Sequence, residues 1–376
     1  MAQGYAGYIG FAEHYLGWGS SATCDLRNFL DPESETLDLG LQERRRENKI
    51  RGERALSLDL VTVDTLAPAG AVVLQPRSDE LAALMAAHFQ AWSRSGEAGG
   101  ATWVGTLIYA MVPTSPHFGG SHWGIFNPSD NLFNGGTAVR DIYPLHLWKS
   151  LGVPTETVYS AKIGFDRGYV EQMEWRVTWD TDLVVTPTFS FRGTTPNKAF
   201  LSAGSEGVMA LQGTSPFNIR FSGWNGTITV DGTANTTLDI EEWNLTTTAG
   251  GEARGRIGNH GPMRFPYENA PTDLGGFLME FKSSKWIERT FSGTGTFGFA
   301  IRFQTSATHW VQIDQPHCRF KPITPQITGR DARIDTAFEY EAFGSAGTPS
   351  TIVSLHTRFA TSAFSLDGTI GVFREE

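Results

Sequence analysis

Cysteine is nearly absent from this sequence, which holds only Cys24 and Cys318 in its 376 residues, one in each half. The two form no Cys-x-x-Cys pair and no disulfide framework, so we expect stability to come from apolar burial in a reducing cytosol. Long apolar runs are also missing, since no stretch approaches the roughly 20 residues of a membrane-spanning helix. Segment 5–18 is interrupted by Glu13 and has no basic beginning, so we expect no ordinary signal peptide.

Positive charge is scarce as well. Lys and Arg together number 30 against 40 Asp and Glu, which gives a formal net charge of −10. A protein that binds nucleic acid through its phosphates carries the opposite sign, because phosphate neutralisation dominates that affinity. The balance therefore argues against a general nucleic-acid binder.

Catalytic motifs are missing too. Segment 293–298 fits Gly-x-Gly-x-x-Gly. A predicted strand follows it, however, so no helix N-terminus faces a pyrophosphate there. The adjacent Glu241 and Glu242 point to opposite faces of a predicted strand and cannot act as an acid–base pair. We predict that the protein is not an enzyme.

The histidines suggest no metal site. His117, His122 and His146 lie among Pro and Gly, at spacings that fit no standard ligand set. The pair His317–Cys318 is more simply a packing histidine beside a buried cysteine. We expect no metal and no cofactor.

Glycine, with 42 residues, and short apolar–polar alternations are abundant instead. Segment 36–41 places Leu37, Leu39 and Leu41 on one face, and segment 55–61 alternates in the same way. Such patterns between turn residues are typical of half-buried β-strands. With 25 Phe and 11 Trp available for cores, the sequence predicts a mainly β fold.

Two helices are predicted among the strands. The stronger has Ser78 as its N-cap candidate, and its buried positions recur at helical spacing: Leu81, Leu84, Met85, His88 and Phe89. The weaker spans 283–291 in the second half.

The two halves present their elements in the same order. Each has a strand, a long excursion with Arg and Gly, a returning strand, a helix, an Ile-centred strand and a final strand ending in aromatic-x-aromatic. The first three are 35–41, 42–54 and 55–63 in one half, and 238–247, 248–273 and 274–282 in the other. This shared order favours an internal duplication.

The predicted boundaries follow from that repeat. The first unit spans 1–193 and contains an insertion at 113–157 that is rich in Pro, Gly and His. A small, polar linker occupies 194–215. The second unit spans 216–376 and ends in an extra hairpin at 346–376.

Both excursions lean basic. Segment 42–54 has six basic and three acidic residues, a local balance of +3 on an otherwise acidic chain. Basic tips on an acidic body suit docking between copies of one chain, although solvated loops would have the same composition. The candidate contacts between copies are Arg44, Arg45, Arg46, Lys49, Arg51, Arg54, Arg254, Arg256 and Arg264.

The strands beside these tips have polar faces opposite their apolar ones. If those faces line a channel, its wall is acidic and hydroxylic and repels phosphate. A plain solvent face of an antiparallel sheet fits the alternation equally well. The candidate channel-facing residues are Asp38, Asp59, Asp239, Glu241 and Glu280.

Three stretches carry a resemblance to a known family. Segment 29–35 reads Phe-Leu-Asp-Pro-Glu-Ser-Glu after an aromatic and Gly-rich start. Segment 159–193 has the form of paired strands that close a unit, and 217–245 has the form of a second-unit start. In this order the chain resembles the tail tube proteins of siphophages, the long-tailed bacteriophages.

The resemblance implies tandem β-sandwich or partial-barrel units, each with a flanking helix and a long hairpin that reaches the next ring. In that family most units assemble six to a ring, so a duplicated chain would need three copies. The implied role is a virion protein, made in the host cytoplasm, whose stacked rings form a hollow tail. Its partners would be further copies, a tape measure protein inside, and terminator and baseplate or tip proteins at the ends, with double-stranded DNA passing through without specific binding.

A rival reading is a two-domain carbohydrate-binding β-sandwich of a tail fibre or adhesin. Trp103, Trp123 and Trp148 in predicted aromatic-rich loops would then stack on sugars. A hydrolase is a third possibility, but it has no catalytic set in its favour.

Overall fold

The computed structural model describes residues 7–13, 28–30, 32–45, 61–66, 68–77, 80–81, 84–85, 88–89, 91–99, 102–111, 145–151, 161–196, 220–231, 233–234, 239–250, 272–280, 288, 295–323, 335–345, 348–360, 365–367 and 372–374. Its architecture is mainly β, as the sequence predicts, and every strand pairing among these residues is antiparallel.

The first half supplies β1 (Gly7–Glu13), β2 (Asn28–Leu30), β3 (Pro32–Glu35), β4 (Leu41–Arg45), β5 (Val61–Leu66), β6 (Ala69–Leu74), β7 (Ala91–Gly99), β8 (Thr102–Met111), β9 (Leu145–Leu151), β10 (Ala161–Thr178) and β11 (Val184–Pro196). The second supplies the 3-10 turn η4 (Gly223–Asn225), then β12 (Gly226–Val230), β13 (Thr233–Ala234), β14 (Ile240–Thr248), β15 (Thr272–Glu280), β16 (Phe297–Ser306), β17 (His309–Phe320), β18 (Asp335–Ala342), β19 (Thr351–Ala360), β20 (Ser365–Asp367) and β21 (Val372–Arg374).

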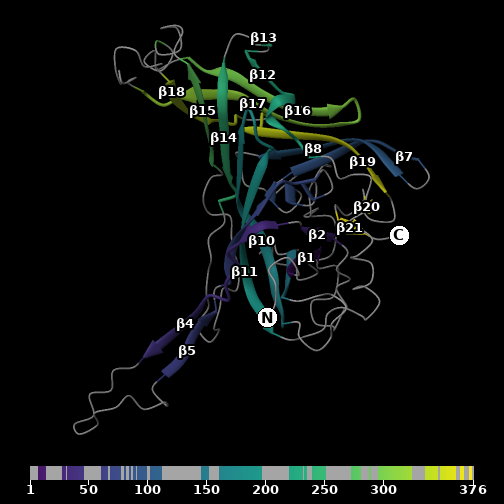
Figure 1. The fold of residues 1–376 in the computed structure, drawn as a ribbon, viewed down its shortest axis with the longest axis vertical. Coiled ribbons are helices and arrows are strands. Elements are labelled where there is room, and N and C mark those ends of the chain that lie inside the picture. Colours follow the sequence, from purple (N-terminus) through teal and green to yellow (C-terminus); the bar gives the residue numbers. More distant parts are fainter. Residues whose placement is uncertain are drawn as a thin grey trace.

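Most of these strands belong to one continuous sheet that folds back on itself, so that two layers face each other (Figure 1). We call the layer β3-β6-β11-β10-β14-β15-β18 sheet 1. The layer β7-β8-β19-β17-β16-β12-β13 is sheet 2. The layers join where Cys318–Phe320 of β17 pair with Tyr340–Ala342 of β18.

Each sheet contains strands from both halves of the chain. In sheet 1, residues 172–178 of β10 pair with residues 242–248 of β14. In sheet 2, the whole of β8 pairs with β19. The two halves are therefore held together by backbone hydrogen bonds as well as by side-chain packing.

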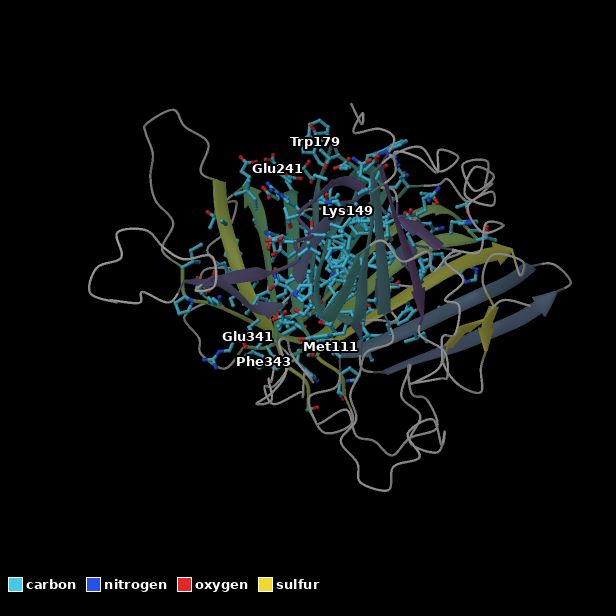
Figure 2. The ribbon with its side chains drawn as sticks, turned by 90° about the horizontal axis from the view of Figure 1, so that it is seen from below. Met111, Lys149, Trp179, Glu241, Glu341 and Phe343 are labelled. Atoms are coloured by element: carbon cyan, nitrogen blue, oxygen red, sulfur yellow. The ribbon has the colours of Figure 1, made fainter. Side chains whose placement is uncertain are left out.

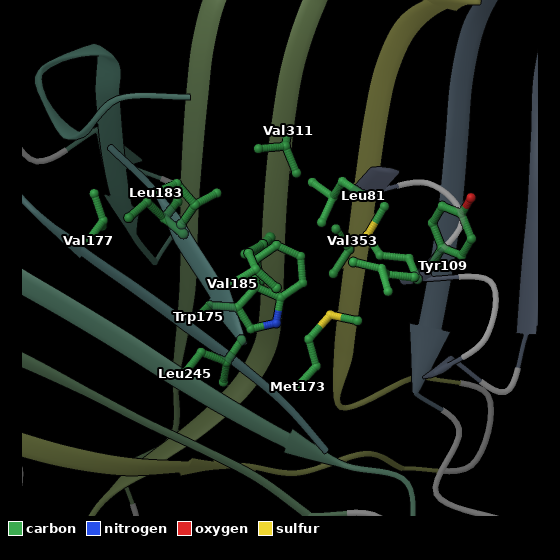
Figure 3. Packing of buried hydrophobic residues seen from close by; sticks show 14 of the residues in the cluster. Leu81, Tyr109, Met173, Trp175, Val177, Leu183, Val185, Leu245, Val311 and Val353 are labelled. Carbon is green, nitrogen blue, oxygen red and sulfur yellow. The ribbon is translucent and has the colours of Figure 1, made fainter. Parts of the chain in front are cut away.

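An aromatic core fills the space between the sheets. The Phe277 ring of sheet 1 stacks on Phe299 of sheet 2 at 6.0 Å between centroids, and Trp243 lies 6.3 Å from Phe303. Figure 3 shows the core continuing through Trp175 of sheet 1 toward residues of sheet 2 and its neighbours. Burying each such side chain stabilises the fold by about 1.5–3 kcal/mol, which explains how the chain folds without disulfides among the described residues.

One chain of polar contacts crosses this core in a single direction. Trp243 Nε1 donates to the Tyr340 hydroxyl (3.1 Å), which donates to Gln315 Oε1 (2.8 Å). Gln315 Nε2 donates to Thr351 Oγ1 (3.2 Å), and that hydroxyl donates to Asp273 Oδ2 (2.8 Å). Because buried polar groups are costly when unsatisfied, this relay fixes the relative positions of five strands.

The stretch predicted to form the stronger helix is helical at Glu80, Leu81, Leu84, Met85 and His88. It contacts both sheets, because His88 bonds to β10 and β14 while the Phe89 ring lies 6.1 Å from Tyr109 of β8. Leu81 N donates to Arg77 O (2.9 Å), so the cap lies at Arg77. The Glu80 carboxylate accepts from the Arg77 backbone N–H at 2.9 Å, the return contact of a capping box. Ser78, the predicted cap, lies outside the described residues.

His88 fastens this helical stretch to strands of both halves. Its Nδ1 faces the carbonyl oxygen of Val170 at 3.0 Å and therefore carries the proton, so Nε2 accepts from the Thr247 hydroxyl at 2.7 Å. Burial lowers the pKa of His88 to about 4, against the opposing effect of the Val170 hydrogen bond. The imidazole thus stays neutral at physiological pH.

Two segments contribute more to the sheets than the sequence predicts. Within the predicted insertion 113–157, β9 pairs with β1 and β10 and buries Leu147. Within the predicted extra hairpin 346–376, β19 lies between β8 and β17. In β19, buried and half-buried residues alternate from Thr351 to His356, and in β9 the recurring Leu145, Leu147 and Leu151 share one face. Strand β11 also continues through Pro196, into the predicted linker 194–215.

The relay ends on a carboxyl group that costs stability at neutral pH. Burial raises the pKa of Asp273 to about 6 from an ordinary 3.8, hydrogen bonds from Ser350 and Thr351 oppose the shift, and Glu341 adds to it. Because the native pKa is raised, protonated Asp273 contributes favourably to the stability of the folded state below pH 3.8. This contribution is lost as the pH rises through about 6.

We therefore expect Asp273→Asn, which keeps an acceptor for Thr351, to stabilise the protein by about 1–3 kcal/mol at pH 7.5. The gain over the wild type should shrink steadily between pH 6 and 4, because the wild-type carboxyl becomes protonated there. Urea unfolding of both proteins across this range measures the difference. A gain that stays constant with pH would contradict the assignment.

Candidate functional site

The outward face of sheet 1 is a polar surface that several described strands build together. Along β10, Trp175 and Val177 are buried while Glu174 and Arg176 are exposed. This period of two places alternate side chains on opposite faces of the sheet. The outward side chains of β10 therefore point away from the aromatic core.

The register carries this polar face across the sheet. Glu174 of β10 pairs with Thr186 of β11 on one side and with Thr246 of β14 on the other. Residues that are directly opposite in antiparallel strands share a face. We call the resulting surface the acidic face, defined by Glu174, Arg176, Thr186, Thr188, Glu242, Asn244, Thr246, Glu339 and Glu341.

Carboxylates outnumber cations on and beside this face. Arg176 is engaged with Glu242, at 3.0 Å between Nη2 and Oε1. Lys321 Nζ lies 3.2 Å from Glu339 Oε2, and both groups are exposed. Arg319 is exposed opposite Glu341, and the remaining uncharged groups are mainly hydroxyls and amides. The face therefore has a small excess of negative charge, which disfavours phosphate within the roughly 8 Å over which charges act at physiological salt.

The predicted channel-facing residues are distributed around this face. Asp38 forms a bridge to Ala69, and Ala69 pairs with Ser190 of β11, so Asp38 lies on the outward side of sheet 1. Its side chain is exposed. Glu280 is half-buried at the far side of the sheet, opposite Asp335 of β18.

The other predicted residues are less central. Asp239 is exposed just before β14, and Glu241 lies at the register irregularity between Ile240 and Glu242. Asp59 lies outside the described residues. Glu242 is the residue that faces outward with Asn244.

Sequence reasoning missed most of the acidic face. Glu174, Glu339 and Glu341 lie on strands whose alternation is visible in the sequence, but their common face depends on which strands are neighbours. The β10–β14 and β15–β18 pairings bring them together, and no local pattern encodes those pairings.

The predicted basic contacts concern β4 and β5, which form their own two-stranded ribbon. Arg45 pairs with Val61 and Leu41 with Leu66. Figure 1 shows this ribbon extending away from the rest of the molecule. Arg44 and Arg45 lie in β4, whereas the other predicted contacts lie outside the described residues: Arg46, Lys49, Arg51, Arg54, Arg254, Arg256 and Arg264.

Two of the three tryptophans of the carbohydrate-binding alternative lie in strands instead of loops. Trp103 is inside β8, where it pairs with Phe359 of β19, and Trp148 is inside β9. Trp123 lies outside the described residues.

Reactive groups do not converge within the part of the chain that the structure describes. No group of three His, Cys, Asp or Glu side chains there is placed to hold a metal ion. Cys318 is buried as predicted, and burial raises the pKa of its thiol, while its neighbour His317 is exposed instead of packed.

None of the described helical residues belongs to a helix of the length and apolarity needed to cross a membrane.

The sequence matches none of the protein-family models and none of the curated proteins with which we compared it.

The acidic face should tolerate substitution without loss of the fold. Exposed ion pairs contribute about 0–1 kcal/mol each, so we expect the combined variant Glu174→Gln, Glu242→Gln, Glu339→Gln to unfold within about 1–2 kcal/mol of the wild type. Urea titration with circular dichroism tests this. A much larger loss would mean that these carboxylates serve stability.

Proposed function

We propose that this chain is a structural protein of a phage tail, a duplicated tail tube protein whose stacked rings enclose a channel for DNA. The acidic face is the observation that carries the proposal. A tube that conducts DNA needs a wall that does not hold phosphates. On the outward side of sheet 1 carboxylates outnumber cations, and Arg176 and Lys321 are each paired with a glutamate.

Recurring strand pairing supports the two-unit arrangement. In the first half, β3 and β6 pair with each other, the β4–β5 ribbon lies between them in the sequence, and β6 also pairs with β11. In the second, β14 and β15 pair with each other, segment 249–271 lies between them in the sequence, and β15 also pairs with β18. Between these partners each half has one hairpin of sheet 2, β7–β8 or β16–β17.

The junction between the halves supports closure into a ring. Residues 172–178 of the first unit and 242–248 of the second form one ladder within the chain. If the same kind of junction forms between chains, sheet 1 continues from copy to copy. Three chains then supply the six units of a ring, and closure covers the open strand edges that would otherwise pair without control.

The first test is the state of the purified protein. We expect size-exclusion chromatography with light scattering to detect trimers or longer assemblies as concentration rises, and negative-stain microscopy to show rings or hollow tubes. A protein that stays monomeric at every concentration would contradict the proposal.

The acidic face supplies a sharper test with a matched control. Ala337 is exposed and shares the row of Glu242 across Leu278 of β15. Asn244→Lys with Ala337→Lys therefore adds two charges to exposed positions of the outward side of sheet 1, and Thr227→Lys with Gln304→Lys adds the same charge to exposed positions of sheet 2. We expect tubes of the first variant to retain a short DNA duplex at low salt, with retention falling steeply as salt rises.

Tubes of the wild type and of the sheet 2 variant should retain much less of the duplex. Co-sedimentation of labelled DNA measures all three. Equal retention by the two lysine variants would mean that the acidic face does not line the channel.

A further inference from the structure

Two tryptophans of the described chain are exposed to an unusual degree. Trp179 is 66% exposed and Trp224 is 77% exposed, although large aromatic side chains are normally the best buried in a protein of this kind. Figure 2 shows Trp179 at one edge of the molecule, near Glu241 and opposite the edge that carries Phe343.

The two tryptophans belong to neighbouring segments that are firmly held. Gly223 N donates to Thr181 O (2.9 Å), and Leu183 N donates to Phe221 O (2.7 Å). A Cβ on Gly223 would lie 2.0 Å from Thr178 O, so η4 is pressed directly against the turn that joins β10 to β11. The tryptophans thus project from one rigid platform.

Carboxylates surround this platform. Asp180 is exposed and accepts from the Thr178 hydroxyl at 2.8 Å, and Asp182 accepts from the Ser222 hydroxyl. Trp179 N donates to the Glu241 carbonyl oxygen at 3.0 Å, which brings the acidic start of β14 alongside. We call Trp179, Asp180, Trp224 and Glu241 the tryptophan platform.

The platform and the β4–β5 ribbon lie at opposite ends of the same strands. Leu74 of β6 pairs with Val185, close to the β10–β11 turn, whereas Ala69 pairs with Ser190, farther from it. From Ala69 the chain leads back through Leu66 to Val61, so the ribbon extends away from the turn. Copies stacked in the same orientation would bring each ribbon toward a platform.

We propose that the tryptophan platform receives the β4–β5 ribbon of a second copy of this chain, in the neighbouring ring of the tube. The inference rests on the proposed function and adds the receiving surface to it. Segment 42–54 carries six basic residues. A guanidinium can lie on an indole face while it donates to a carboxylate, a combination that the platform offers and lysine exploits less well.

The charge of the platform favours this occupant over a sugar. Five carboxylates lie in residues 179–182 and 239–242. The cations on the adjoining segments are Arg176, which is engaged with Glu242, and Arg220, which donates to Gln75. Neutral sugars gain little from such a charge, whereas segment 42–54, which begins in β4 and has six basic and three acidic residues, is attracted by it. Binding of neutral glycans is therefore the competing outcome in the test.

The test compares three variants in a tube-growth assay followed by light scattering and negative-stain microscopy. Trp179→Ala with Trp224→Ala removes the indoles, Arg44→Glu with Arg45→Glu reverses ribbon charges, and Phe343→Ala removes an exposed aromatic side chain from the opposite edge as the control. Because all the altered side chains of the platform are exposed, circular dichroism should show an unchanged fold.

We expect the first two variants to form rings but to need at least about tenfold more protein for tube growth, and the control to behave as the wild type. Normal tube growth by the double tryptophan variant would show that the tryptophan platform does not receive the ribbon, while the proposed tube function would still stand. Binding of neutral glycans that is lost in that variant, without any effect on growth, would overturn that receiving role too. A wild type that forms neither rings nor tubes would overturn the proposed function together with this inference.

Discussion

The ladder between β10 and β14 joins the two halves of the chain, and most of the other features depend on its register. It pairs Trp175 with Leu245 on the core side and Glu174 with Thr246 on the outward side. A slip of one residue would move the aromatic side chains to the surface and the carboxylates into the core. Core burial therefore fixes the position of every group on the acidic face.

The same ladder suggests how copies associate. Within the chain it covers one edge of β10 and one edge of β14. Sheet 1 then ends at β3 on one side and at β18 on the other, where the end of β17 already covers Tyr340–Ala342. Pairing between copies at such edges would extend the core and the acidic face together. In the account proposed here, tube closure, channel chemistry and stability are consequences of one repeated backbone interaction, and the ribbon and tryptophan platform add contacts along the other direction.

Much of this architecture was predictable from the sequence, and the reasons are local. Alternation predicted strands at 170–179, 184–192 and 332–342, which the structure has as β10, β11 and β18. Helical spacing predicted that Leu81, Leu84 and Met85 are buried. Strand partners were not predictable, because they depend on contacts between segments that are distant in the sequence. Strand β19 of the second half pairs with β8 of the first, and β9 pairs with β10 although it lies within a predicted insertion. The acidic face and the tryptophan platform each require such partners, so the sequence alone could not assemble them.

A density map of the assembled particle would test the central claim most directly. The account predicts three chains in each ring, with Glu174, Glu242 and Glu339 facing a continuous channel. A particle in which these side chains face the outside, or lie buried between chains, would contradict it.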